Sequence, residues 1–124
     1  MKTVTFDFDD TIVMSHMLIE DNKPIFVFDG YNNKIIQLIQ SHIKAGDDVH
    51  IVTARSKEKE DLFPEFTVPA YLDKLSLSHY FTPERIHYTE SALKLEVLQK
   101  LGSMLHYDDS LEEISNNFGK IRVK

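Results

Sequence analysis

The segment Val-Thr-Phe-Asp-Phe-Asp-Asp-Thr at residues 4–11 places three acids directly behind a short apolar run. Residues 3–8 are rich in β-forming side chains and predict a strand, which runs into Asp7, Asp9 and Asp10. Like charges this close repel one another, and an unpaired carboxylate that leaves water is costly. The strand is therefore predicted to end either in a solvated loop or at a bound cation.

Predicted strands and helices alternate along the chain. Apolar side chains recur at helical spacing in several segments, and short runs of β-forming residues lie between them. The predicted helices are residues 33–45, 71–81, 93–101 and 111–119, and the predicted strands are 3–8, 49–55, 85–89, 103–110 and 120–124. Residues 14–28 form two extended runs around a polar turn, which predicts a β-hairpin. This order indicates an α/β fold with a mostly parallel sheet.

The bulk properties are those of one globular domain. Hydrophobic residues make up 42% and charged residues 27% of the 124 residues, so we expect a single domain over 1–124. Without cysteine, a disulfide framework, a thiolate nucleophile and a cysteine zinc site are excluded. Because an acid at residue 7 comes too early for a signal peptide and no apolar run approaches ~18 residues, we expect a cytoplasmic protein with no membrane contact. The net charge of −6 argues mildly against broad nucleic-acid binding.

Three of the predicted strands end in polar side chains, at the edge of a parallel sheet where ligands bind. Beyond the acids of the first strand, the second strand ends in Thr53 and Arg55, and the fourth ends in Asp108 and Asp109. Carboxylates from two strand ends suit Mg²⁺, which binds through one or two carboxylates, water and substrate phosphate. The sequence therefore predicts a cation site formed by acids from the first and fourth strands.

The residues at these strand ends also suit phosphoryl transfer. A carboxylate can attack phosphorus as a covalent nucleophile, and a second, protonated carboxyl group can donate to the leaving group. The phosphate oxygens need hydroxyl or amide donors and cations around them. Thr53 could supply the hydroxyl. Lys94 could supply the cation from the first turn of its predicted helix, where backbone N–H groups favour an anion.

Four motifs, in this order, match a known family. They are Asp-Phe-Asp-Asp-Thr at 7–11, Thr53 in Val-Thr-Ala-Arg, Lys94, and Asp-Asp-Ser at 108–110. Together they resemble the haloacid dehalogenase-like phosphohydrolases over nearly the whole chain. The resemblance implies a three-layer α/β sandwich with a five-stranded parallel sheet in the order 3-2-1-4-5. It also implies a Mg²⁺-dependent phosphomonoester hydrolase that acts through an aspartyl-phosphate.

The resemblance assigns roles to the acids. Asp7 would be the nucleophile, and Asp9 would be the acid and base of the reaction. The Mg²⁺ ligands would come from both strand ends: the Asp7 carboxylate, the Asp9 backbone carbonyl, and Asp108 or Asp109. The presence of Asp9 matches the phosphatases of the family rather than its dehalogenases, which lack that second acid.

The phosphoryl group would be bound by Thr53 and Lys94, with Lys100 further along the same helix as the alternative lysine. Arg55 belongs either to a solvated charged segment or to a bidentate phosphate contact. Its Thr-Ala-Arg segment, on a body without a cap, is similar to the polynucleotide 3′-phosphatases. The expected substrate is therefore a nucleotide or nucleic-acid end phosphate or a small phosphometabolite.

Residues 56–82 are too few for a large cap domain, so the hairpin at 14–28 is expected to be the main lid. No obligate protein partner is evident.

One alternative to the phosphatase function is a related module that binds phosphorylated ligands without catalysis. A second is a signalling receiver domain, which needs a phosphoacceptor Asp after a mid-chain strand, where this chain has Thr-Ala-Arg. A zinc site is not indicated by the scattered histidines, and an EF-hand over 7–18 lacks its glycine and its final glutamate.

Overall fold

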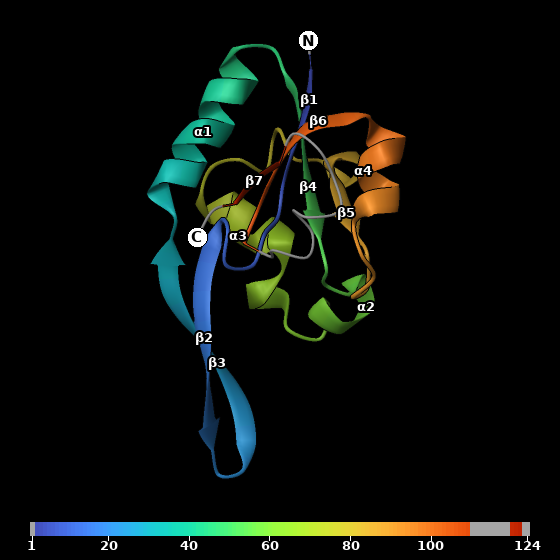
Figure 1. Cartoon of the computed structure of the whole chain (residues 1–124). Coiled ribbons are helices and arrows are strands. Elements are labelled where there is room, and N and C mark those ends of the chain that lie inside the picture. The colour runs from blue at the N-terminus through green and yellow to red at the C-terminus, as the bar shows by residue number, and fades with distance from the viewer. Residues whose placement is uncertain (1, 110–119, 123–124) are drawn as a thin grey trace.

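The computed structural model describes residues 2–109 and 120–122 (Figure 1). The strands in this part of the chain are β1 (Thr3–Phe6), β2 (Val13–Glu20), β3 (Lys23–Tyr31), β4 (Asp48–Thr53), β5 (Ile86–Tyr88), β6 (Ser103–Asp108) and β7 (Lys120–Arg122). The α-helices are α1 (Asn33–Lys44), α2 (Lys57–Glu60), α3 (Val68–Lys74) and α4 (Leu95–Leu101), with short 3₁₀ turns at Pro64–Phe66 and Pro83–Arg85. The helix predicted at 111–119 lies outside the described residues. Of the helices described, none is long and apolar enough to cross a bilayer.

The central sheet is parallel and has β1 in its middle. Strands β5, β4, β1 and β6 pair in that order, and β7 pairs in parallel with the free edge of β6. Strands β2 and β3 form a separate antiparallel pair. The predicted α/β class is confirmed. Because β4 and β6 flank β1, the polar residues at the ends of these three strands meet at one edge.

Alternation along β1 divides the sheet into an apolar and a polar face. Val4 and Phe6 are fully buried in the main core, where the ring of Phe6 stacks on Tyr107 with centroids 4.5 Å apart. Between them, Thr5 points to the other face and hydrogen-bonds His106. Helices α1 and α4 lie on opposite sides of the strands (Figure 1). The core is thus packed mainly on the α1 side, and buried polar groups gather on the α4 side.

The predicted helix at 33–45 is confirmed as α1. The side chain of Asn32 accepts a hydrogen bond from the Ile35 backbone and caps the first turn. Ile35, Ile36 and Ile39 share the buried face, as their spacing predicts. Beyond the helix, Gly46 has φ of 85°, a left-handed conformation that glycine adopts at little cost.

The predicted helix at 71–81 is wrong in its boundaries. Helix α3 begins earlier, where Thr67 caps its first turn, and it ends at Lys74. Ser76 then adopts φ of 60°, which no α-helix continues through. Leu77 and Phe81 are nevertheless buried in the core. Their apolar spacing therefore reflects packing of a turn segment rather than a helix.

The predicted hairpin is confirmed and is longer than 14–28, because β2 begins at Val13 and β3 ends at Tyr31. Its turn contains only two residues, Asp21 and Asn22, with φ of 51° and 62°. Such positive values are typical of the tight turns that suit the twist of paired strands. The hairpin projects from the body beyond the edge of the sheet at which β1 ends (Figure 1).

Candidate active site

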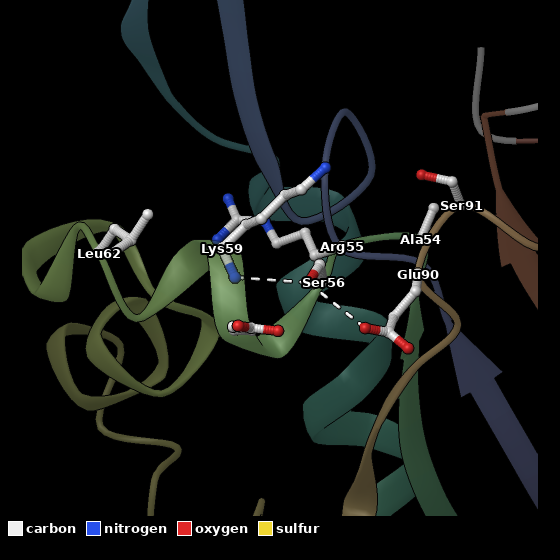
Figure 2. A pocket seen from close by; sticks show the side chains of 8 residues that line it. Ala54, Arg55, Ser56, Lys59, Leu62, Glu90 and Ser91 are labelled. Carbon is white, nitrogen blue, oxygen red and sulfur yellow. Dashed lines mark hydrogen bonds between the residues drawn. The ribbon is translucent and has the colours of Figure 1, made fainter.

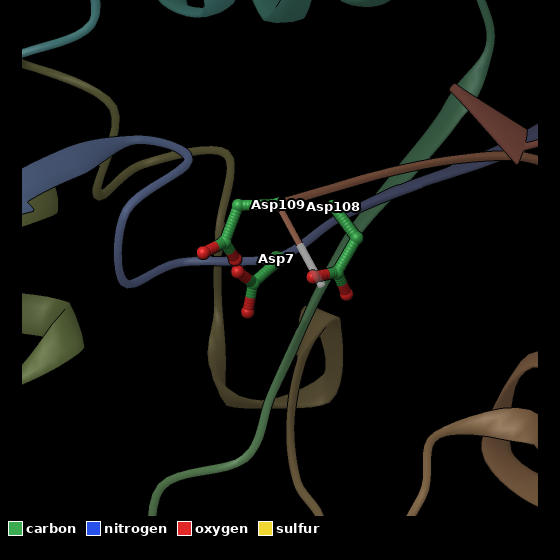
Figure 3. Close-up of side chains that lie close together, drawn as sticks. All are labelled: Asp7, Asp108 and Asp109. Carbon is green, nitrogen blue, oxygen red and sulfur yellow. The ribbon is translucent and has the colours of Figure 1, made fainter. Parts of the chain in front are cut away.

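Asp7, Asp108 and Asp109 form one cluster at the ends of β1 and β6. The register pairs Phe6 with Tyr107, so the next residue of each strand is an acid, and the Asp7 backbone N–H donates to the Tyr107 carbonyl at 2.8 Å. One carboxylate oxygen from each acid lies within 4.8 Å of the others, and the three side chains converge (Figure 3). Asp7 and Asp108 are buried, and Asp109 is half-buried.

Lys94 joins two of these acids. Its Nζ donates to Asp7 Oδ1 and to Asp108 Oδ2, both at 2.7 Å, and its side chain is almost fully buried. Lys94 stands directly before α4 rather than within its first turn. Lys100, the alternative lysine, is exposed and pairs with Glu96 at 3.4 Å. Of the two lysines, only Lys94 therefore lies in the acid cluster.

A buried chain of polar side chains supports Asp108. His106 Nε2 lies 2.8 Å from Asp108 Oδ2, and Thr5 Oγ1 lies 2.8 Å from His106 Nδ1. Neither residue was selected from the sequence, where the scattered histidines only failed to indicate a zinc site. Strand alternation was the available signal, because residues two apart on a strand share a face. By that rule Thr5 lies on the same face of the sheet as Asp7, and His106 lies on the same face as Asp108.

The acid cluster carries more negative charge than Lys94 balances. Burial raises the pKa of Asp7 from its ordinary 3.8 to about 8, Lys94 opposes this shift, and the neighbouring Asp108 carboxylate adds to it. A cluster of this kind takes up either a proton or a cation. Its donors are all carboxylate oxygens from two adjacent strand ends, which is the chemistry that Mg²⁺ prefers. The residues present therefore fit the predicted ion.

Asp9 is held apart from the acid cluster by Arg55. The guanidinium donates to both carboxylate oxygens of Asp9 at 2.8 Å, and also to Glu60 at 3.1 Å and to the Phe66 carbonyl at 2.6 Å. These contacts raise the pKa of Arg55 despite its partial burial. The Asp9 carboxylate is thus fixed by a bidentate pair, and Arg55 is committed to protein groups rather than placed as a phosphate contact.

Glu60 was not selected from the sequence, because it lies in the charged segment Arg-Ser-Lys-Glu-Lys-Glu. It is buried, and besides Arg55 its carboxylate accepts from the Val68 backbone at 3.1 Å and from Tyr88 Oη at 2.5 Å. Lys57 of the same segment is exposed and pairs with Asp61 at 2.7 Å. The segment is therefore a solvated helix, α2, with one buried acid that anchors Arg55.

Thr53 ends β4 next to the acid cluster. The register pairs Phe6 with Ile51, so Thr53 lies two residues beyond the end of β1, level with Phe8. Its side chain is buried, and its Oγ1 accepts from the Arg55 backbone N–H at 3.3 Å. The structure thus places Thr53 at the same edge of the sheet as Asp7, as the sequence predicts.

The loop after β1 turns sharply at Asp10, whose φ is 61°. Aspartate tolerates this left-handed conformation better than most residues. The Phe8 carbonyl accepts from the backbone of Thr11, Ile12 and Val13 at 3.3, 2.9 and 3.2 Å. Thr11 Oγ1 then reaches back and donates to Asp7 Oδ2 at 3.1 Å. The turn therefore holds Asp7 in place and sends the chain on into the hairpin.

A depression of about 510 Å³ lies beside the end of β4 (Figure 2). Residues from the ends of β4 and β5 and from α2 line it: Ala54, Arg55, Ser56, Glu58, Lys59, Leu62, Glu90 and Ser91. Glu90 and Ser91 have φ of 54° and 69°, and their backbone N–H groups donate to the carbonyls of Arg55 and Ala54 at 3.2 and 2.7 Å. Strained backbone of this kind persists where neighbouring structure holds it. These two backbone hydrogen bonds thus tie one wall of the depression to the residues that follow Thr53.

Comparisons of the chain with protein-family models, with curated proteins and with solved structures found no match.

Proposed function

We propose that the protein is a Mg²⁺-dependent phosphomonoester hydrolase with Asp7 as its nucleophile. One observation carries the proposal: Asp7, Asp108 and Asp109 converge within 4.8 Å, and Lys94 joins the first two. The parallel sheet with β1 between β4 and β6 supports the resemblance to haloacid dehalogenase-like phosphohydrolases and its three-layer sandwich.

The Mg²⁺ ion would be held by the carboxylates of Asp7, Asp108 or Asp109 and by the Asp9 backbone carbonyl. When bound, the ion neutralises charge on the phosphoryl group and on the acids. With a cation beside it, Asp7 stays ionised at neutral pH, although burial, opposed by Lys94 and aided by Asp108, raises its pKa to about 8 without the cation. The ionised carboxylate is the form that attacks phosphorus.

The reaction has two steps that balance in atoms and charge. Asp7 forms a bond to phosphorus, the ester P–O bond breaks, and the departing alcohol oxygen takes a proton from Asp9, which enters this step protonated on one oxygen and keeps its other oxygen on Arg55. Water then attacks the phosphorus of the aspartyl-phosphate and gives a proton to Asp9, which releases phosphate and restores Asp7. Thr53 and Lys94 bind the phosphoryl oxygens. Arg55 is a positioning residue, because its bidentate pair fixes the Asp9 carboxylate.

The surroundings of Thr53 support the expected substrate class. The depression beside it is open, with Lys59 and Glu90 supplying charges of both signs and Ser56 and Ser91 supplying hydroxyls. Such a lining suits the polar alcohol part of a nucleotide, a nucleic-acid end or a small phosphometabolite. A comparison of kcat/KM for a 3′-phosphorylated oligonucleotide, mononucleotides and sugar phosphates discriminates among them.

Turnover of p-nitrophenyl phosphate tests the proposal. We expect hydrolysis with Mg²⁺ and none with EDTA, and we expect Asp7→Asn to reduce turnover to background because the nucleophile's charge is removed. Asp10→Asn is the matched control, since Asp10 is an acid of the same loop outside the acid cluster and Asn also tolerates its left-handed φ. Beryllofluoride should bind to wild type and not to Asp7→Asn. Near-normal activity of Asp7→Asn would contradict the proposal, and ligand binding without turnover by wild type would favour the non-catalytic module.

A further inference from the structure

The hairpin β2–β3 carries an apolar face on an element that projects from the body (Figure 1). Residues directly opposite in an antiparallel pair share a face, and the face alternates along each strand. The pairs Ser15–Phe28, Met17–Phe26 and Ile19–Pro24 therefore lie on one side of the hairpin, which we call the Met17 face. None of these six residues is charged. Most of their apolar side chains are open to solvent: Met17 56%, Ile19 76%, Phe26 75% and Phe28 44% exposed.

The opposite side of the hairpin differs in chemistry. It carries His16, which pairs with the Asp29 carboxylate at 2.7 Å, and the cross-strand pair Glu20–Lys23 near the tip. Its apolar pair, Leu18 and Ile25, is 50% and 39% exposed and stands between these charged pairs, and Val27, opposite His16, is half-buried. That side is suited to water, whereas the Met17 face is suited to burial.

A hairpin of this length requires support that the described part of the chain supplies only at its base. There Phe28 packs on Tyr71 of α3 with ring centroids 5.7 Å apart. A two-stranded hairpin alone in water is marginally stable, and an exposed apolar strand pair promotes association. Toward the tip the Met17 face is open to solvent, with Met17, Ile19 and Phe26 56%, 76% and 75% exposed. The face is therefore built to meet another surface.

We propose that the Met17 faces of two copies of this chain pack together and form a symmetric dimer. A two-fold axis through the pair Met17–Phe26 lays the hairpins face to face and antiparallel. It brings the tip pair Ile19–Pro24 of each copy to the base of the other, where Phe28, packed on Tyr71, is still 44% exposed. Each uncharged cross-strand pair of one Met17 face thus meets an uncharged pair of the other, and no charged side chain of the hairpin is buried between them.

The size and charge of the Met17 face agree with a second copy of the chain as its partner. Two phenylalanines and three further apolar side chains offer on the order of 500 Å² of apolar surface. A stable interface buries about 800 Å² per partner, of which about 60% is apolar, or roughly 480 Å². In the antiparallel arrangement the acidic tip residue Asp21 of one copy approaches the base of the other. Lys74 stands at that base, over the ring of Tyr71 at 5.7 Å.

Solution mass tests the proposal on the full chain. We expect wild type at about 100 µM, well above a micromolar dissociation constant, to have twice the chain mass by light scattering. Phe26→Lys should weaken association by at least about 100-fold, because a lysine is then buried without a partner. Leu18→Lys, on the opposite side of the same hairpin, should remain dimeric. Circular dichroism checks that both variants are folded.

Cross-linking gives a second, independent measurement. The chain contains no cysteine, so Met17→Cys introduces a single thiol beside the proposed two-fold axis. Facing sheets lie about 10 Å apart, and a bismaleimide of that span should join two Met17→Cys chains, but not two Leu18→Cys chains. A monomeric wild type, equal dissociation of Phe26→Lys and Leu18→Lys, equal cross-linking of the two thiols, or a monomer that binds lipid vesicles through this face would each overturn the proposal.

Discussion

The ion pair between Asp9 and Arg55 gives each residue a distinct role in the proposed reaction. The two short bonds to both carboxylate oxygens hold the acid in one orientation, and Glu60 and the Phe66 carbonyl hold the arginine. An acid that delivers a proton to a departing oxygen depends on such positioning. Arg55 therefore acts through Asp9 in our proposal, and not by binding the substrate.

Asp9→Asn should lower turnover of alkyl phosphates by roughly 10²–10⁴-fold, because their leaving oxygen needs a proton. The loss on p-nitrophenyl phosphate should be much smaller, since p-nitrophenolate leaves without protonation. Arg55→Gln should show the same split between substrates with little change in KM. Steady-state kinetics on both esters measures this, and an equal loss on both substrates, or a raised KM alone, would instead make Arg55 a phosphate ligand.

Lys94 should be important for stability as well as for catalysis. Lys94→Met leaves the buried carboxylates of Asp7 and Asp108 without their lysine, which for a broken buried ion pair costs about 3–5 kcal/mol. Urea unfolding in EDTA should show this loss, and saturating Mg²⁺ should reduce it because the cation replaces the missing charge. Lys100→Met is the control and should cost less than about 1 kcal/mol, since its pair with Glu96 is exposed. Equal losses in EDTA and Mg²⁺ would contradict cation binding at this cluster.

At the scale of elements, β4 and β5 are joined by a histidine pair. His50 Nδ1 and His87 Nε2 lie 2.9 Å apart, and His50 also contacts the Asp48 carboxylate at 3.0 Å. Arg85, just before β5, forms an ion pair with the same Asp48. Partial burial lowers the pKa of His87, and the neighbouring His50 lowers it further. His87 is thus kept neutral in the folded protein near neutral pH.

The His50–His87 pair predicts that the free energy of unfolding falls in mild acid. An unfolded His87 takes up a proton near pH 6.5, whereas the folded residue does so only at lower pH, so the unfolded chain binds more protons between these values. The contribution of His87 to stability is therefore present above about pH 6.5 and is lost as pH falls through the lower folded pKa. Urea unfolding at pH 7.5 and 5.5 should show a smaller difference for His87→Gln than for wild type. His79→Gln, at an exposed position, should behave as wild type.

At the scale of the whole molecule, cation binding should stabilise the fold. An ion that binds only the folded chain adds RT ln(1 + [L]/Kd), which is about 2.7 kcal/mol at one hundred times Kd. The denaturation midpoint should rise with Mg²⁺ in wild type and in Asp10→Asn. It should not rise in the double variant Asp108→Asn/Asp109→Asn, which removes both candidate ligands at the end of β6. A rise of the same size in all three proteins would show that Mg²⁺ acts elsewhere.

The sequence by itself determined the class of the fold and the location of the acids. The period of apolar residues marks strands and helices locally, and β1, β4, β6, α1 and the hairpin were predicted in this way. Parallel strands have their carboxyl ends at one edge, so Asp7 was expected near Asp108 and Asp109 before any contact was known. These predictions hold because they depend on backbone direction and strand alternation, which short segments already specify.

Only the tertiary structure decided which side chains meet across that edge. Local pattern does not distinguish Lys94 from Lys100, and the choice came from the approach of α4 to the sheet. Long, flexible side chains such as Arg55 reach partners far along the chain, here Asp9 at a separation of 46 residues. The direction of the hairpin was likewise set by the turn after β1. The tip of the apolar Met17 face therefore projects beyond the body, while its base packs on Tyr71. Contacts between distant segments depend on how the elements pack, and no single segment encodes that packing.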